Sequence, residues 1–234
     1  MHFLNDRRPW FGTLHGPPLT VRELIDRGTL SHETAGTLWW AIDHGASVFV
    51  AAGPPGAGKS IVATALLEFL PQDARVYVTS GTADRLAIPP VTDGPIYLLI
   101  NELSWHMPLY LSGRSAQRAF GLLGSRVRIL GTLHAQSAAE AAQVMCDEAA
   151  VTRTDLSTAF VFAVVSAWRS EGVVHRRVSD LGFLPPVSGD LQLLSPDDPT
   201  SMHALASWSG VNDVTREINR RAALLARPDI SQLP

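Results

Sequence analysis

Residues 53–60 read GPPGAGKS and match the pattern G-x-x-x-x-G-K-[ST] at every specified position. The run before the motif, ASVFVAA at 46–52, is short, apolar and β-branched, which is typical of a buried strand. The run after it, SIVATALLEFL at 60–70, spaces its apolar residues for one helix face, and Pro71 ends that helix. The motif therefore lies between a predicted strand and a predicted helix.

Residue types in this stretch favour phosphate binding. Pro54 and Pro55 have no N–H group, so the phosphate donors should be the backbone amides of residues 56–60. Glycines let the backbone approach phosphate without a Cβ, and the helix N-terminus adds a favourable dipole. We predict that the nucleotide-binding residues are Gly53, Gly56, Ala57, Gly58, Lys59, Ser60 and Ile61.

Lys59 is the single lysine of the chain, beside eighteen arginines. Its compact ammonium suits the β- and γ-phosphates, where the planar fork of arginine would not fit. The hydroxyl of Ser60 is the expected ligand for Mg²⁺. The sequence thus predicts ATP and Mg²⁺ as cofactors, although no motif chooses between ATP and GTP.

A second apolar run, PIYLLINEL at 95–103, predicts a strand that ends at Asn101 and Glu102. ATPases with this phosphate loop place an acidic residue at such a strand end. We therefore assign Glu102 a catalytic role in activating water. The alternative is a glutamate exposed to solvent at a strand end.

A third run, RVRILGTL at 126–133, predicts a strand that leads into His134. The carboxyl end of a central strand is the ligand side of an open α/β sheet, so we predict that His134 contacts the γ-phosphate. A loop histidine without such a role is the alternative. Ser137 and Glu140 predict a capping box at the start of the next helix.

The order GPPGAGKS, INE and HAQS resembles the secretion, type IV pilus and archaellum ATPases. That family has a Walker A loop, an atypical Walker B motif ending in Gly-Glu, and a His-Ala-Asn-Ser box. The resemblance spans residues 19–227, including the lead-in segment at 19–47, the strand-turn-strand pattern at 160–181 with its basic stretch, and the helical pattern at 214–230.

Several positions depart from the family pattern. The acidic Ile-Glu-Asp box is replaced by Thr79-Ser80-Gly81, with Asp84 slightly beyond. Ser104 stands where an arginine follows Gly-Glu, and Gln136 replaces asparagine. With 52 residues before Gly53, we also expect the separate N-terminal domain of the family to be absent.

The resemblance implies an α/β P-loop NTPase fold, of the RecA-like ASCE type, with a mostly parallel sheet flanked by helices and a C-terminal helical appendage. It also implies an ATPase that acts as a homo-oligomer such as a ring, or beside a larger secretion or pilus partner. Separately, the single cysteine and the lack of a signal-peptide-like stretch in residues 1–10 predict a cytoplasmic location, with the inner face of the membrane as an option. No apolar run reaches the ~18–20 residues that span a bilayer.

Proline- and glycine-rich stretches that predict loops divide the chain into four parts. These are an arm with lead-in helices at 1–45, the ATPase core at 46–184, a Pro-rich linker at 185–200 and a C-terminal helical segment at 201–234. In the arm, we expect Trp10 and Phe11 to pack on the body rather than on a partner. At least one of Trp39 and Trp40 should lie in the core, with purine stacking as the alternative.

Arginines cluster between Glu102 and His134, and one of them could reach the γ-phosphate of a neighbouring subunit as an arginine finger. The candidates are Arg114, Arg118 and Arg128.

Composition narrows the function classes. The net charge of −3 gives no basic excess, so we expect no nucleic-acid partner. The single Cys146 excludes an intrachain disulfide and a cysteine-based zinc site. An ATP-binding switch with little hydrolysis remains the main alternative to the ATPase, favoured by the missing acidic box. A small-molecule kinase is a third option, which the histidine box disfavours.

Overall fold

The computed structural model describes residues 2–3, 10, 17–79, 81, 94–187, 189–195 and 197–228. Within them, one mixed sheet has the strand order β1-β3-β4-β5-β2-β6-β7-β8. The strands are β1 (His2–Phe3), β2 (Ser47–Ala51), β3 (Arg75–Val78), β4 (Ile96–Ile100), β5 (Val127–Leu133), β6 (Phe160–Ser170), β7 (Val173–Leu184) and β8 (Gln192–Leu193).

The five central strands, β3, β4, β5, β2 and β6, pair in parallel. Parallel neighbours need crossover connections between them. In this part, β5 separates β2 from β4, giving the order β3-β4-β5-β2-β6. That order, with a glycine-rich loop after β2, defines the RecA-like P-loop NTPase fold, so the predicted fold class is confirmed. Strands β7 and β8 extend the sheet in the antiparallel sense.

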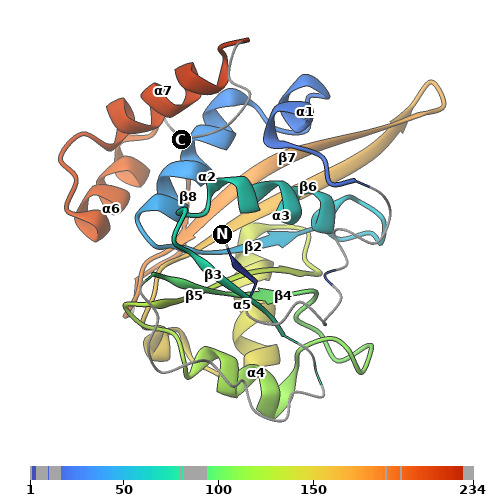
Figure 1. Ribbon diagram of the computed structural model, residues 1–234, viewed down its shortest axis with the longest axis vertical. Helices are drawn as coiled ribbons and strands as arrows, with labels where there is room; N and C mark the ends of the chain where they lie inside the picture. The colour runs from blue at the N-terminus through green and yellow to red at the C-terminus, as the bar shows by residue number, and fades with distance from the viewer. Residues whose placement is uncertain are drawn as a thin grey trace.

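Helices cover both faces of the sheet (Figure 1). They are α1 (Val21–Asp26), α2 (His32–Asp43), α3 (Lys59–Ala65), α4 (Gly113–Phe120), α5 (Ala138–Ala149), α6 (Pro199–Ser209) and α7 (Val214–Leu225). One face carries α1, α2, α3, α6 and α7, and the other carries α4 and α5. Of the two helices of the C-terminal appendage, α7 packs on the lead-in helix α2, whereas α6 contacts α7 and the edge strand β8.

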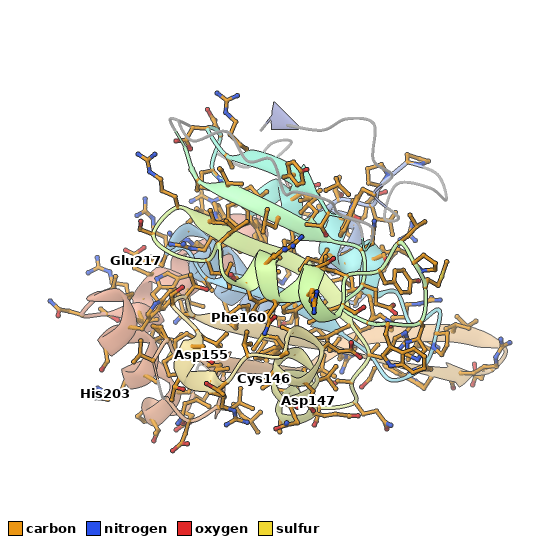
Figure 2. The ribbon with its side chains drawn as sticks, turned by 90° about the horizontal axis from the view of Figure 1, so that it is seen from below. Cys146, Asp147, Asp155, Phe160, His203 and Glu217 are labelled. Carbon is orange, nitrogen blue, oxygen red and sulfur yellow. The ribbon has the colours of Figure 1, made fainter. Side chains whose placement is uncertain are left out.

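Alternation along β2 explains the two cores. Val48 and Val50 face one helical layer, whereas Phe49 faces the other. Burial of both faces suits the continuous apolar runs that predicted these strands. Cys146 of α5 belongs to the second core with Phe160, as Figure 2 places them.

Most predicted boundaries hold within two residues. The helix after the phosphate loop is shorter than predicted, because α3 ends at Ala65 and a 3₁₀ turn (Leu66–Phe69) continues to Pro71. Ser137 caps α5 as predicted, with Oγ accepting from the Glu140 N–H at 3.1 Å. A capping box would also need the Glu140 carboxylate to accept from the Ser137 N–H. It accepts instead from the Gln136 N–H at 2.7 Å, so this half of the predicted capping box was wrong.

The arm returns to the body at Trp10, which is 4% exposed and donates from Nε1 to Thr64 Oγ1 at 2.8 Å. Phe11 lies outside the described residues. Trp39 and Trp40 are both buried, and Trp39 stacks on Phe69 with ring centroids 5.5 Å apart. Burial leaves neither tryptophan open to a purine. No helix in the described part of the chain has the length and apolar character needed to cross a membrane.

Candidate nucleotide site

The phosphate loop turns between β2 and α3 through two left-handed glycines. Gly56 has φ +75° and Gly58 has φ +102°, values that only glycine adopts without strain. Gly58 is also the N-cap of α3, and no side chain caps this end. The first N–H groups of the helix therefore face the loop without a capping side chain, as a phosphate group requires.

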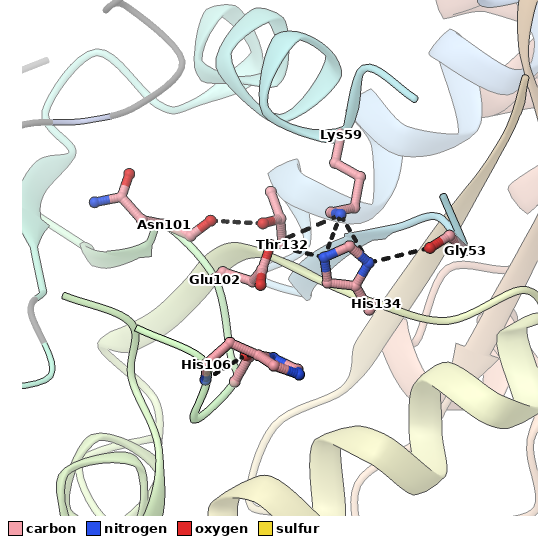
Figure 3. A network of polar contacts seen from close by, with 8 residues as sticks. Gly53, Lys59, Asn101, Glu102, His106, Thr132 and His134 are labelled. Carbon is pink, nitrogen blue, oxygen red and sulfur yellow. Dashed lines mark hydrogen bonds and ion pairs between the residues drawn. The ribbon is translucent and has the colours of Figure 1, made fainter. Parts of the chain in front are cut away.

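Lys59 opens α3 and points to the carboxyl ends of β4 and β5 (Figure 3). It is 8% exposed. Its Nζ lies 3.7 Å from Glu102 Oε2 and 3.2 Å from His134 Nε2. Burial lowers the pKa of Lys59, and the Glu102 charge opposes that change in part. The ammonium is thus held by one carboxylate in a poorly solvated place.

Glu102 follows β4 and is 7% exposed, which excludes the alternative of a solvated strand-end glutamate. Its backbone is fixed because its carbonyl accepts from the Leu111 N–H at 2.9 Å. Beside it, the Asn101 carbonyl accepts from Thr132 Oγ1 of β5. Neighbouring strands therefore hold the carboxylate in place.

His134 follows β5 and bridges the phosphate loop to the carboxylate (Figure 3). Its Nδ1 lies 3.2 Å from the Gly53 carbonyl, and its Nε2 lies 3.2 Å from Glu102 Oε2. The parallel register explains the convergence, since Ala51 pairs with Leu133 and both strands end at the same sheet edge. Lys59, Glu102 and His134, which are far apart in sequence, therefore lie together beside the phosphate loop.

The remaining predicted loop residues lie around this centre. Ala57 is buried at the turn, and Ser60 follows Lys59 in the first turn of α3. Ile61 is 41% exposed and lines a cleft beside the loop. A Cβ added to Gly53 would meet Gln136 Cγ at 2.6 Å, so the third residue of the HAQS box packs against the loop.

The three predicted arginine candidates are not part of this cluster. Arg114 and Arg118 are exposed on α4, on the face of the sheet opposite to α3. Arg128 lies near the start of β5, at the other end of that strand from His134. It donates to the Val127 and Ser125 carbonyls, and burial lowers its pKa.

Thr79 occupies the first position of the missing acidic box. It is buried, and its Oγ1 donates to the Leu99 carbonyl at 3.0 Å. Ser80 and Asp84 lie outside the described residues.

Two residues near the loop had no sequence assignment. Arg176 of β7 donates from Nη2 to the Gly56 carbonyl at 3.3 Å, across 120 positions of sequence. Its only signal was the basic stretch after the strand-turn-strand turn, which does not give the spatial neighbour. Tyr110 lies near Glu102: burial raises the pKa of Tyr110, and the Glu102 charge adds to that effect.

No family model matches the sequence. An uncharacterized protein of Methanocaldococcus jannaschii is 31% identical over 74 residues, which are 32% of this chain and 13% of that protein. The chain therefore spans a small part of the relative's length. Among solved structures, the VirB11 ATPase of the Brucella suis type IV secretion system, in complex with sulphate, matches with a TM-score of 0.41 and 18% identity. The match covers 73% of this chain and 53% of that one.

Strand order, the glycine-rich loop and the buried Glu102 together define the class of this chain. It has a P-loop NTPase fold with a glutamate directly after β4, the strand on the far side of β5 from β2.

Proposed function

We propose that the chain binds Mg-ATP and hydrolyses it, as the motor core of an ATPase of the secretion and pilus type. The observation that carries the proposal is the buried Glu102, 3.7 Å from Lys59 and 3.2 Å from His134, directly above the phosphate loop. A buried carboxylate at this place serves to orient the water that attacks the γ-phosphate.

The residues present fit the nucleotide and its metal ion. The left-handed glycines leave the loop open to phosphate, and the uncapped start of α3 offers N–H donors. Ser60 supplies the hydroxyl expected at Mg²⁺. The bound Mg²⁺ would neutralise charge on the β- and γ-phosphates.

Each central side chain has a distinct task in this proposal. Lys59 leaves Glu102 and binds the β- and γ-phosphates, which are stronger partners because they carry more charge. Glu102, released from the ammonium, accepts the hydrogen bond of the attacking water. His134 contacts the γ-phosphate and keeps its link to the Gly53 carbonyl. Water attack on the γ-phosphorus then yields ADP and phosphate.

A switch with little hydrolysis is the second candidate, and one observation favours it. Thr79 stands in the acidic box with its hydroxyl bound to the Leu99 carbonyl, so it supplies no charge to the site. In this version, Lys59, Glu102 and His134 report nucleotide occupancy to a partner instead of driving turnover.

The proposal extends to assembly. A homo-oligomer, such as a ring, would let a neighbour supply an arginine, and Arg114 and Arg118 are exposed on α4 for that contact. Arg128 is the weaker candidate because it is engaged by its own backbone carbonyls. A partner of the secretion or pilus type at the inner membrane face is the alternative arrangement.

Steady-state phosphate release from Mg-ATP, measured against protein concentration, tests the function. We expect turnover that rises with concentration, a fall of about 100-fold or more in Glu102→Gln, and retained nucleotide binding in that variant. Lys59→Ala should lose binding itself. Binding without turnover in the wild type would favour the switch. Absence of nucleotide binding by the wild type would refute both.

A further inference from the structure

Arg176 reaches the phosphate loop from the side opposite to Glu102. It lies on β7, four positions after Gly172 in the β6–β7 turn, and its Nη2 donates to the Gly56 carbonyl. A Cβ at Gly58 would lie 3.1 Å from Arg176 Cδ, so the side chain covers the loop. Its Nε is buried and, among the described residues, has no hydrogen-bond partner.

The position of Lys59 gives the direction of a bound nucleotide. Lys59 lies with Glu102 and His134 on the β4 and β5 side of the loop, which makes this the side of the γ-phosphate. Strands β6 and β7 lie on the other side of β2. The α-phosphate and the nucleoside must then extend toward β7, where Arg176 is found.

A cleft opens on that side, with a volume of about 310 Å³. It lies between α1, α3 and β7, and its walls are largely apolar, including Leu24, Val62 and Val173. Gly58 and Arg176 line it where it meets the loop. Arg27, Thr29 and His175 also line the cleft, so its mostly apolar walls carry polar groups besides Arg176. Such walls suit a nucleoside whose phosphates leave the cleft beside an arginine.

We propose that Arg176 binds the α- and β-phosphates of the nucleotide, with the nucleoside in the cleft between α1, α3 and β7. The proposal rests on the proposed nucleotide binding. A carbonyl at 3.3 Å is a neutral acceptor, whereas phosphate oxygens form shorter, charge-assisted bonds. The unpartnered Nε and the Nη2 group lie on one edge of the guanidinium, an edge that matches two phosphate oxygens.

A purely structural role for Arg176, in which it only holds the phosphate loop in place, predicts a different result. If Arg176 served only to hold Gly56, its guanidinium would keep that carbonyl as its partner in the complex, and Mg-ADP would not protect it from chemical labelling. Contact with the α- and β-phosphates instead places phosphate over the guanidinium, and the loss on its replacement depends on the number of phosphates. Arg177 is the matched control, since it is the next residue of β7, is exposed, and points to the other face of the strand.

Calorimetric titration with Mg-ADP and with AMP is the main experiment, on Arg176→Gln, Arg176→Lys and Arg177→Gln. We expect Arg176→Gln to weaken Mg-ADP binding 10- to 100-fold and AMP binding less. Arg176→Lys should recover part of the loss, and Arg177→Gln should match the wild type. Thermal unfolding of each variant checks that the hairpin still folds.

Labelling of the wild type with phenylglyoxal, read by peptide mass spectrometry, gives a readout that needs no variant. Mg-ADP should protect Arg176 and leave Arg177 labelled. Unchanged Mg-ADP affinity in Arg176→Gln, an equal loss for Mg-ADP and AMP, or labelling unaffected by Mg-ADP would overturn the proposal while nucleotide binding stands. A wild type that binds no nucleotide would overturn the proposed function as well.

Discussion

Lys59 and Glu102 form an ion pair inside the protein, with Nζ and Oε2 3.7 Å apart and both side chains about 9% exposed. The two residues belong to different elements, the start of α3 and the end of β4. The lysine that should bind phosphate therefore already has an anionic partner. In the proposed function, nucleotide binding exchanges this carboxylate partner for phosphate, and the free-energy cost of that exchange should depend on pH.

Mg-ADP affinity should weaken as pH rises into the alkaline range, at a pH below the ordinary lysine pKa of 10.5. Burial lowers the pKa of Lys59 in the free protein, and a phosphate beside the ammonium raises it again. Binding is therefore strongest when Lys59 is protonated, and it is lost by about tenfold per pH unit above the free-state pKa. Calorimetric titration between pH 7 and 10 measures the effect.

The nucleotide's own phosphate titrates near pH 6, so it does not contribute over that range. A dissociation constant that stays flat to pH 10, in a protein still folded by circular dichroism, would contradict the prediction.

Gly36→Ala should destabilise the fold by about 1–3 kcal/mol. Gly36 lies in α2 where α7 crosses it, and an added Cβ would stand 2.9 Å from the Ile218 carbonyl and 3.0 Å from the Ala222 nitrogen. Both contacts are backbone atoms, so α7 must shift. Urea unfolding measures the change. In Gly121→Ala, the nearest atom is 3.3 Å away, and an equal loss there would argue against the contact as the cause.

The bond between Trp10 and Thr64 should contribute about 0.5–1.5 kcal/mol to stability. Trp10 Nε1 donates to Thr64 Oγ1, and the Thr64 hydroxyl donates to the Ser60 carbonyl. A double-mutant cycle with Trp10→Phe and Thr64→Val isolates the interaction energy of the pair from the effect of each single change. Additive losses in urea unfolding would mean that the arm is held by apolar packing alone.

Arg221→Gln should destabilise the protein by about 1 kcal/mol at pH 7. Arg221 pairs with Asp43 and Glu217 at 2.8 Å each and lies over the Trp39 ring. Its hydrogen bond lowers the pKa of Glu217. Because the pKa of this carboxyl is lower in the folded protein, the carboxylate stabilises the fold at any pH above its ordinary pKa. This stabilisation is lost as pH falls through the folded-state pKa.

The difference between Arg221→Gln and the wild type should therefore narrow below pH 4.5, the ordinary value for Glu217. Thermal unfolding across pH 3–7 measures it. Arg216→Gln, an exposed change on the same helix, should shift little at any pH; a matching shift would mean that the helix charge, not the pairing, controls stability.

Local signals in the sequence were enough for the core of the site. The loop motif, the apolar strands that end at Glu102 and His134, and the Ser137 cap depend on neighbours in the chain, and parallel strands bring their ends together. These features could be predicted because sequence spacing fixes them.

Long-range contacts could not be predicted in this way. The Arg176–Gly56 and Trp10–Thr64 bonds join residues 120 and 54 positions apart. Nothing local distinguishes Arg176 from Arg177, although only Arg176 faces the loop. Among the described residues, no ion pair joins Glu102 to the arginines chosen for their proximity to it in sequence; Arg114 and Arg118 are exposed on α4, and Arg128 lies near the start of β5.

The β6–β7 hairpin reaches past the other strands (Figure 1) and carries exposed Trp168 and Val173 near its turn. From Val165 to the turn its two strands pair without a break, and Arg176 pairs with Ala167 beside the Trp168–His175 pair, so the exposed outer end and Arg176 belong to one paired segment. If Arg176 binds the phosphates as proposed, a partner that binds the outer end of the hairpin and shifts this arginine will alter nucleotide affinity. By thermodynamic reciprocity, an arriving nucleotide must then alter the affinity for that partner by the same factor.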